Sequence, residues 1–184
     1  MLVIVRLAGE PSRLRVGVWR ELRRVGAVPL AQGVWAMPAT PVFTAAVAAA
    51  REVARRGDGE LVCVEVTGRD EDSANALRAA FTAARAEEWA EFVADCDKFD
   101  AEIGKEIGKQ KFTLAELEEE EQSLERLRRW YRDLKLRDVL ELPQAREAEQ
   151  RLKQCTEVLA DYADQVYRAM HDPAQSGPAD TNQG

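Results

Sequence analysis

The feature that most constrains the fold is a heptad pattern of apolar residues that occurs three times after residue 88. The first stretch carries Trp89, Phe92, Cys96, Phe99 and Ile103; the second carries Leu117, Leu124, Leu127, Tyr131 and Leu134; the third carries Ala148, Leu152, Cys155, Leu159, Tyr162 and Val166. Alternating spacings of three and four residues place one apolar seam along a helix. Three such helices joined by short turns predict an antiparallel, coiled-coil-like three-helix bundle.

Start and stop signals bound these helices. The first is predicted to begin at Ser73, the second follows the capping-box pattern Thr113-Leu-Ala-Glu116, and Leu142-Pro143 restarts the chain before the third. Gly104 and Gly108 lie four residues apart inside the first helix. Each glycine costs a helix about 1 kcal/mol, so their spacing predicts the close approach of a neighbouring helix.

The first 68 residues have a different pattern, in which short β-branched runs alternate with two helices. Strands are predicted at residues 2–7, 27–31, 34–37 and 61–66, and helices at 13–25 and 41–56. Ser12 is a candidate cap for the first helix, Gly26 ends it, and Pro29 marks an edge strand. The order βαββαβ predicts a ferredoxin-like unit in an α+β protein. The expected domains are therefore 1–68 (ferredoxin-like), 73–170 (helical bundle) and 171–184 (disordered tail).

Charge is divided unevenly along the chain, whose net charge is −7. Residues 1–70 carry 10 Lys and Arg against 7 Asp and Glu, whereas the remainder is strongly acidic. This balance argues against nonspecific coating of nucleic acid but allows a local basic patch in the first part. Three widely spaced cysteines, Cys63, Cys96 and Cys155, indicate buried free thiols in a reducing compartment. With no signal-peptide pattern and no membrane-length apolar run, a cytoplasmic protein is expected.

Two arginine clusters are the candidate binding sites. The first, for DNA or an anion, lies on the predicted helix 13–25 and comprises Arg13, Arg15, Arg20, Arg23 and Arg24. Arg13, Arg20 and Arg24 share the face opposite the apolar stripe, and guanidinium groups form paired hydrogen bonds to phosphate-like oxygens. The second, for an oxyanion, comprises Arg126, Arg128 and Arg129 beside Trp130. The alternatives are a solvated helix face for the first cluster and, for the second, which faces the acidic run 118–121 in sequence, intramolecular pairing within the bundle.

Nothing in the sequence has the arrangement of a catalytic or cofactor site. There is no Ser-His-Asp or Cys-His arrangement, and the segment 104–109 departs from a phosphate-binding loop in spacing and in its final residue. The carboxylates Glu87, Glu88, Glu91, Asp95 and Asp97 could hold a hard cation only with partners from another helix, such as the run 118–121. We therefore expect a protein that is not an enzyme, with no metal and no cofactor.

Three long segments, residues 15–38, 87–99 and 111–134, resemble the N-terminal domain of ChrB, the bacterial chromate-resistance protein. The resemblance implies a cytoplasmic, chromate-responsive regulator of a chromate-efflux operon, with promoter DNA and chromate or another oxyanion as partners. Longer ChrB proteins continue into a second domain. The alternative is therefore an interaction module that docks a separate chromate-resistance partner without binding DNA itself. An open edge strand also makes a homodimer an expected assembly.

The first part is also similar to the ferredoxin-like domain of PaaX-type transcription regulators, and through it to a small CRISPR-associated nuclease. That nuclease places a metal-binding aspartate at the end of its first strand. Here the strand ends with Arg6-Leu7. The resemblance therefore does not imply nuclease activity, and no winged-helix segment of the kind that begins a PaaX-type protein is visible.

Overall fold

The computed structural model describes residues 1–7 and 12–171, and the predicted disordered tail falls almost wholly outside these residues. The described chain is an α+β protein, mostly helical, with a four-stranded antiparallel sheet and five helices. It divides into two compact units. The first comprises Met1–Glu91 and Arg132–Arg146, and the second comprises Phe92–Tyr131 and the described residues from 147 onward. No described helix combines the length and apolar character needed to cross a membrane.

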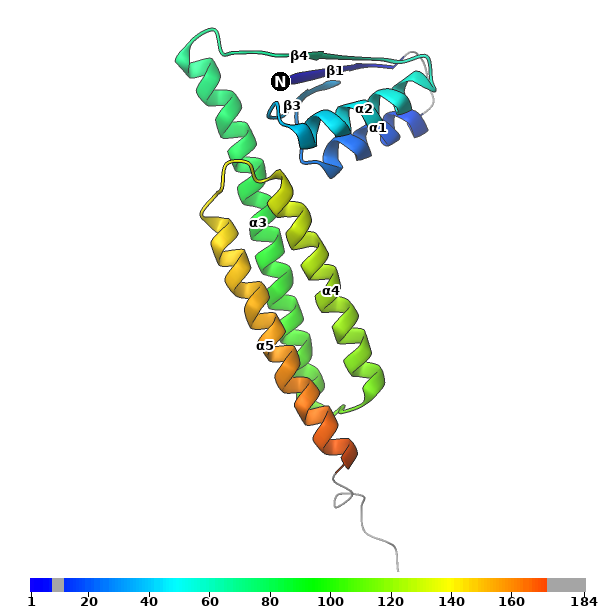
Figure 1. The fold of residues 1–184 in the computed structure, drawn as a ribbon, viewed down its shortest axis with the longest axis vertical. Helices are drawn as coiled ribbons and strands as arrows, with labels where there is room; N and C mark the ends of the chain where they lie inside the picture. Colours follow the sequence, from blue (N-terminus) through cyan, green and yellow to red (C-terminus); the bar gives the residue numbers. More distant parts are fainter. Residues whose placement is uncertain (8–11, 172–184) are drawn as a thin grey trace, which may run out of the picture. The chain divides into compact units, whose positions relative to one another are not determined.

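The first unit contains the predicted alternation of strands and helices. Its elements are β1 (Leu2–Arg6), α1 (Ser12–Arg24), β2 (Val28–Ala31), β3 (Val34–Ala36), α2 (Pro41–Arg55) and β4 (Glu60–Val64). The strands lie in the order β2-β3-β1-β4, so Pro29 is on an edge strand as predicted. In the register, Val3 of the central strand β1 is opposite Trp35 on one side and Cys63 on the other. Helices α1 and α2 lie on the same face of the sheet (Figure 1).

Apolar side chains from both helices meet the sheet in one core. Val18 and Leu22 of α1 and Phe43 of α2 are almost completely buried against Val3. Phe81, from the beginning of α3 (Glu71–Gly108), meets the Phe43 ring edge-on at a centroid distance of 6.0 Å. The sheet and its two helices therefore share their core with a residue well beyond the last strand.

Two glycines make the predicted turns of this unit. Gly26 has φ 81° and ends α1, where the amide of Ala27 donates to the carbonyl of Leu22 at 3.0 Å. Gly33, with φ 74°, lies in the turn between β2 and β3, and its carbonyl accepts a 2.7 Å hydrogen bond from Val5. Both conformations lie in the left-handed region that glycine adopts without a steric penalty.

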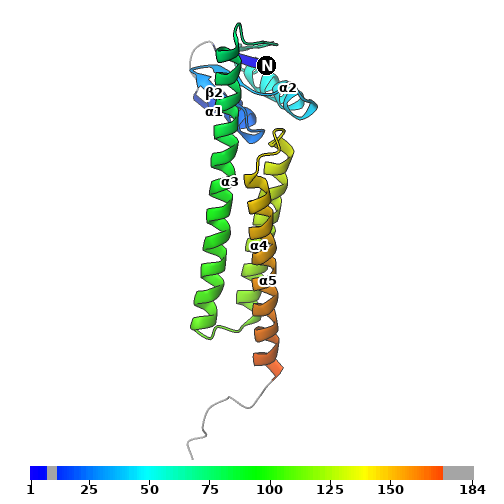
Figure 2. The ribbon, with the colours of Figure 1, turned by 90° about the vertical axis from the view of Figure 1, so that its left-hand side faces the viewer.

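The second unit consists of three long helices side by side: the rest of α3, most of α4 (Leu114–Arg137) and most of α5 (Gln144–His171) (Figures 1 and 2). The predicted seams form its interior. Phe92, Cys96, Leu124, Tyr162 and Val166 are at most 2% exposed. Among the predicted seam residues only Tyr131 and Leu152 are half-buried.

Helix starts and interior glycines correct three sequence predictions. Helix α3 begins at Glu71 rather than at Ser73, because the Asp70 carboxylate accepts a 2.8 Å hydrogen bond from the Ser73 amide, which also lowers the pKa of Asp70. Only half of the capping box forms: Thr113 Oγ1 accepts from the Glu116 amide at 3.3 Å, but the Glu116 carboxylate pairs with Lys111. The predicted close approach at Gly104 and Gly108 is wrong, because a Cβ at either position would meet nothing within 4 Å.

Candidate functional site

Helix α1 carries the densest cluster of exposed cations in the first unit. Val18 and Leu22 hold one side of the helix in the core, which leaves the opposite side to solvent. The exposed arginines on that side, Arg13, Arg20 and Arg24, form what we call the outer arginine face. Arg13 and Arg20 form no hydrogen bond or ion pair with any of the residues that the structure describes, whereas Arg24 pairs with Glu21 at 3.0 Å. Two guanidinium groups on this face are therefore available to a ligand.

A second row of side chains runs along the same helix with a spacing of four residues. It consists of Arg15, Trp19 and Arg23, which we call the Arg-Trp-Arg ridge. The Arg23 guanidinium lies over the Trp19 ring, 5.6 Å from its centroid, and Trp19 remains 50% exposed. Arg15 is exposed and has no partner within residues 1–7 and 12–171. A tryptophan half exposed to water between two cations is unusual for a residue that serves packing alone.

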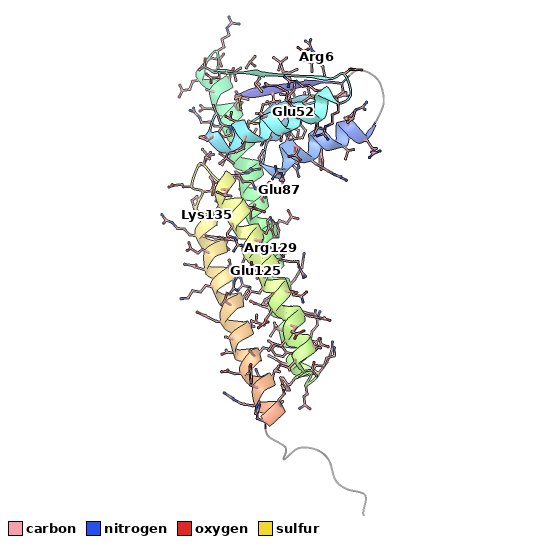
Figure 3. The ribbon with its side chains drawn as sticks, turned by 45° about the vertical axis from the view of Figure 1, so that its right-hand side comes forward. Arg6, Glu52, Glu87, Glu125, Arg129 and Lys135 are labelled. Atoms are coloured by element: carbon pink, nitrogen blue, oxygen red, sulfur yellow. The ribbon has the colours of Figure 1, made fainter. Side chains whose placement is uncertain are left out.

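A pocket of about 610 Å³ lies beside this ridge, bounded by α1, the end of β1 and the turn between β2 and β3. Arg15 and Gln32 are its polar side chains without a partner in the described chain, and Trp19 and Trp35 are among its walls. Arg6 also lines it, but the Arg6 guanidinium lies 3.7 Å from the Glu60 carboxylate on the neighbouring strand (Figure 3 labels Arg6). None of the described residues around the pocket is acidic. The pocket therefore favours an anionic ligand with a flat or apolar body.

The second arginine cluster is largely engaged within the helical unit. Arg126 donates to Ser123 Oγ at 2.9 Å, and Arg128 donates to Thr156 at 3.5 Å and lies 3.9 Å from Glu125. Arg129 is exposed and has no partner among the described residues; Figure 3 labels it together with Glu125 on α4. The alternative, pairing within the bundle, is therefore what forms for Arg126 and Arg128, although their partners lie outside the acidic run 118–121. The two arginine clusters also belong to different compact units.

Sequence analysis missed a buried ionic cluster in the first unit. Arg85 is 2% exposed, and its Nη2 donates to Glu88 at 3.0 Å, while burial lowers the pKa of Arg85. Arg137, at the end of α4, lies 3.3 Å from the same carboxylate and donates to the Arg24 carbonyl at 2.9 Å, where α1 ends. Arg137 therefore holds the carboxyl end of α1, whose carbonyls carry partial negative charge, and the Arg85 guanidinium lies beside Gly26 there. The sequence signals were the three-residue spacing of Arg85 and Glu88, typical of ion pairs on a helix, and Gly26, which indicates a helix end rather than ion pairing.

A buried carboxylate, that of Asp138, extends this cluster. Asp138 is 6% exposed and accepts hydrogen bonds from Trp89 Nε1 at 2.9 Å and from the Leu142 amide at 3.2 Å. A cation site on the carboxylates of this helix does not assemble around Glu88, because both oxygens of Glu88 face arginines. Within the described ranges, no group of three or more His, Cys, Asp or Glu side chains could hold a metal ion.

The cysteines are thiols with little access to solvent. Cys96 and Cys155 are completely buried, and the Cys155 Sγ lies 3.6 Å from the Cys96 carbonyl oxygen. The hydrogen bond with Cys96, together with burial, raises the pKa of Cys155 and keeps it a neutral thiol. Cys63 is only half-buried and accepts a weak hydrogen bond from Arg51 at 3.8 Å. The prediction of buried thiols is therefore confirmed for two of the three cysteines.

Comparison with known proteins gives one match. The family model described as the N-terminal part of protein ChrB matches residues 15–173, which covers the second arginine cluster, the first cluster except Arg13, and most of the pocket. No curated protein and no solved structure matches the chain.

Proposed function

The chain belongs to the ChrB N-terminal family of chromate-resistance-associated proteins, and on that premise we propose that it is a cytoplasmic, non-enzymatic regulator of transcription that binds DNA through α1. The main observation behind this proposal is the outer arginine face, where Arg13 and Arg20 are exposed without a partner in the described chain. Helix α1 has five arginines and one acidic residue in a protein whose net charge is −7.

Arginine is suited to this task because its planar guanidinium gives two parallel hydrogen bonds to phosphate oxygens. A helix of 13 residues is about 20 Å long, so arginines along it can contact several phosphates of a duplex. Contacts of this kind position a protein on DNA without selecting its sequence. The proposal for the outer face is therefore phosphate binding, and it leaves base recognition to other residues or to a partner.

The same geometry supports a response to chromate. Chromate is a tetrahedral dianion, and the guanidinium groups that bind a phosphate also bind an oxyanion of that shape. We therefore propose that chromate competes with DNA phosphates for the outer arginine face and releases the protein from its operon.

The fold also supports a specific architecture for the two parts of the chain. Strand order β2-β3-β1-β4 with α1 and α2 on one face is the arrangement expected of a ferredoxin-like unit, and the buried heptad seams of α3, α4 and α5 support a coiled-coil-like bundle. The exposed edge of this sheet at β2 also leaves a homodimer as part of the proposal.

The test is a gel shift with the promoter of the protein's own chromate-resistance operon, with and without chromate. The variant Arg13→Gln/Arg20→Gln/Arg24→Gln should weaken binding at least tenfold and lower the slope of log affinity against log salt by about 2, one for each of the two guanidinium groups without a partner in the described chain. The matched control Arg69→Gln/Arg146→Gln/Arg168→Gln removes three exposed arginines elsewhere and should bind like the wild type. Equal losses in both triple variants, or no salt-sensitive binding at all, would remove the DNA role.

A second candidate is an interaction module that docks a separate chromate-resistance partner. The observation in its favour is the acidic run on α4, where Glu118, Glu119 and Glu121 are exposed and their carboxylates have no partner in the described chain. Such a run fits a basic partner surface. Reversing these three charges to lysine should abolish co-purification with that partner, and undiminished recovery would count against docking at this surface.

A further inference from the structure

We propose that the Arg-Trp-Arg ridge and its pocket bind an unstacked nucleotide, so that the nucleic acid recognised by α1 contains a single-stranded or extruded base. This inference deepens the proposed function, because it names the form of nucleic acid that the site accepts. It rests on a different set of side chains from the outer arginine face, namely Arg15, Trp19 and Arg23, and on Gln32 of the adjoining turn.

The first argument is the state of Trp19. Phosphate binding to a duplex needs cations but no exposed aromatic ring, whereas single strands bind to aromatic side chains on which bases stack. Trp19 is 50% exposed although other apolar residues of the same helix, such as Val18 and Leu22, are buried. Its position between Arg15 and Arg23, one helical turn from each, places a cation on either side of a base stacked there.

The second argument is the size and lining of the pocket. A volume of about 610 Å³ is within the range of sites for whole organic ligands and is far larger than a single tetrahedral oxyanion needs. Its walls are apolar, with Val18, Pro29 and Trp35 among them, and they would gain little from a small hydrated anion. A nucleotide combines a flat ring for the apolar walls with a phosphate for a guanidinium.

The third argument is the set of unsatisfied polar groups. Arg15 is the guanidinium at the pocket without an ionic partner in the described chain, since Arg6 faces Glu60. The Gln32 side chain offers both a donor and an acceptor, as the edge of a base requires. Because no described lining residue is acidic, a phosphate entering the pocket meets no carboxylate from the described lining. The ligand class that uses all of these groups is a nucleotide freed from base stacking.

The experiment measures fluorescence anisotropy of three labelled probes with the full chain: a twelve-residue oligodeoxythymidylate, the corresponding oligouridylate, and a DNA duplex of equal length. We expect at least one single strand to bind about tenfold or more tightly than the duplex, and the tighter of the two identifies DNA or RNA as the source. Trp19→Ala should weaken binding of that single strand about 5- to 150-fold, the range for loss of one base–aromatic stack, while duplex binding changes less than twofold.

Two further variants complete the test, one at the pocket and one as a control elsewhere. Arg15→Gln should also weaken the single strand, because it removes the phosphate contact at the pocket. Tyr167→Ala removes an aromatic side chain that is 57% exposed on α5 and should leave every probe unaffected. Since Trp19 is half in solvent, its replacement should not unfold the chain, and circular dichroism checks this.

The results separate the inference from the proposed function. If the duplex binds and responds to the outer-face triple variant, but Trp19→Ala leaves single-strand affinity unchanged, the nucleotide site is refuted and the DNA role stands. If the duplex binds as tightly as both single strands, the nucleotide site is refuted as well. If a single strand binds through Trp19 while the promoter duplex does not bind, the nucleotide site stands and the duplex role falls.

Discussion

Replacing Gly26 with alanine should destabilise the first unit. Two effects add at this position. Gly26 has φ 81°, a left-handed conformation that costs a residue with a Cβ about 1–2 kcal/mol. A Cβ built there would lie 1.8 Å from Arg85 Nη1 and 2.8 Å from Arg137 Cδ, so both side chains must move.

The second effect is the larger one because Arg85 has little room to move. It is 2% exposed and pairs with Glu88, and forcing extra volume into such a site costs about 1–3 kcal/mol. Together, the two effects predict that Gly26→Ala lowers the free energy of unfolding by about 2–5 kcal/mol. Urea unfolding followed by far-ultraviolet circular dichroism measures this quantity.

A double-mutant cycle with Arg85→Ala separates the two effects. Without the guanidinium, the alanine at position 26 should cost only the backbone strain of about 1–2 kcal/mol, and the coupling between the two positions should be about 1–3 kcal/mol. The explanation fails if Gly26→Ala has the same cost in both backgrounds, because the contact with Arg85 would then carry no energy.

Three further predictions concern stability. Gly104→Ala should raise the free energy of unfolding by about 0.5–1 kcal/mol, since its Cβ would enter open space on a helix, and a lower urea midpoint would contradict this. Asp138→Ala should lower it by about 2–4 kcal/mol, because Trp89 Nε1 and a loop amide lose their buried acceptor; calorimetry that shows an unchanged melting temperature would rule this out. Burial, and after it the neighbouring carboxylates, raise the pKa of Glu120 in the folded state above its ordinary value of 4.5. The folded chain therefore binds the Glu120 proton more tightly than the unfolded chain does, and the free energy of unfolding falls as the pH rises above 4.5. Glu120→Gln should therefore stabilise the protein at pH 7 but not below pH 4.5, while the exposed Glu118→Gln should have little effect at either pH.

Local signals predicted the elements well because they act within a few residues of chain. The end of α1 at Gly26 and the turn at Gly33 follow from conformations that glycine tolerates, and the structure confirms both. The seams of α3 to α5 follow from spacing alone, since an apolar residue every three or four positions must lie on one side of a helix. The start of α3 was missed by two residues because Asp70 competes with Ser73 as a cap, and spacing cannot rank the two.

Local sequence signals predicted only part of the binding surface. Helical periodicity correctly placed Arg13, Arg20 and Arg24 together on an exposed face. It could not show that Arg24 is paired, nor that the turn carrying Gln32 closes a pocket beside Arg15, because these facts depend on how the sheet is assembled. Arg85 and Glu88 are three residues apart, a local helical spacing, but the pairing of Arg137 with Glu88 joins residues about 50 positions apart and leaves no local pattern.

The first compact unit is interrupted in sequence, since it includes Met1–Glu91 and then Arg132–Arg146. During synthesis its strands leave the ribosome long before Arg137 and Asp138, which complete the hydrogen bonds to Arg24 and Trp89. The nascent sheet therefore lacks these hydrogen bonds until the forty residues between the two segments have been translated. A fragment cut after the last strand would never form these hydrogen bonds, so deletion variants of this protein should keep the chain at least to residue 146.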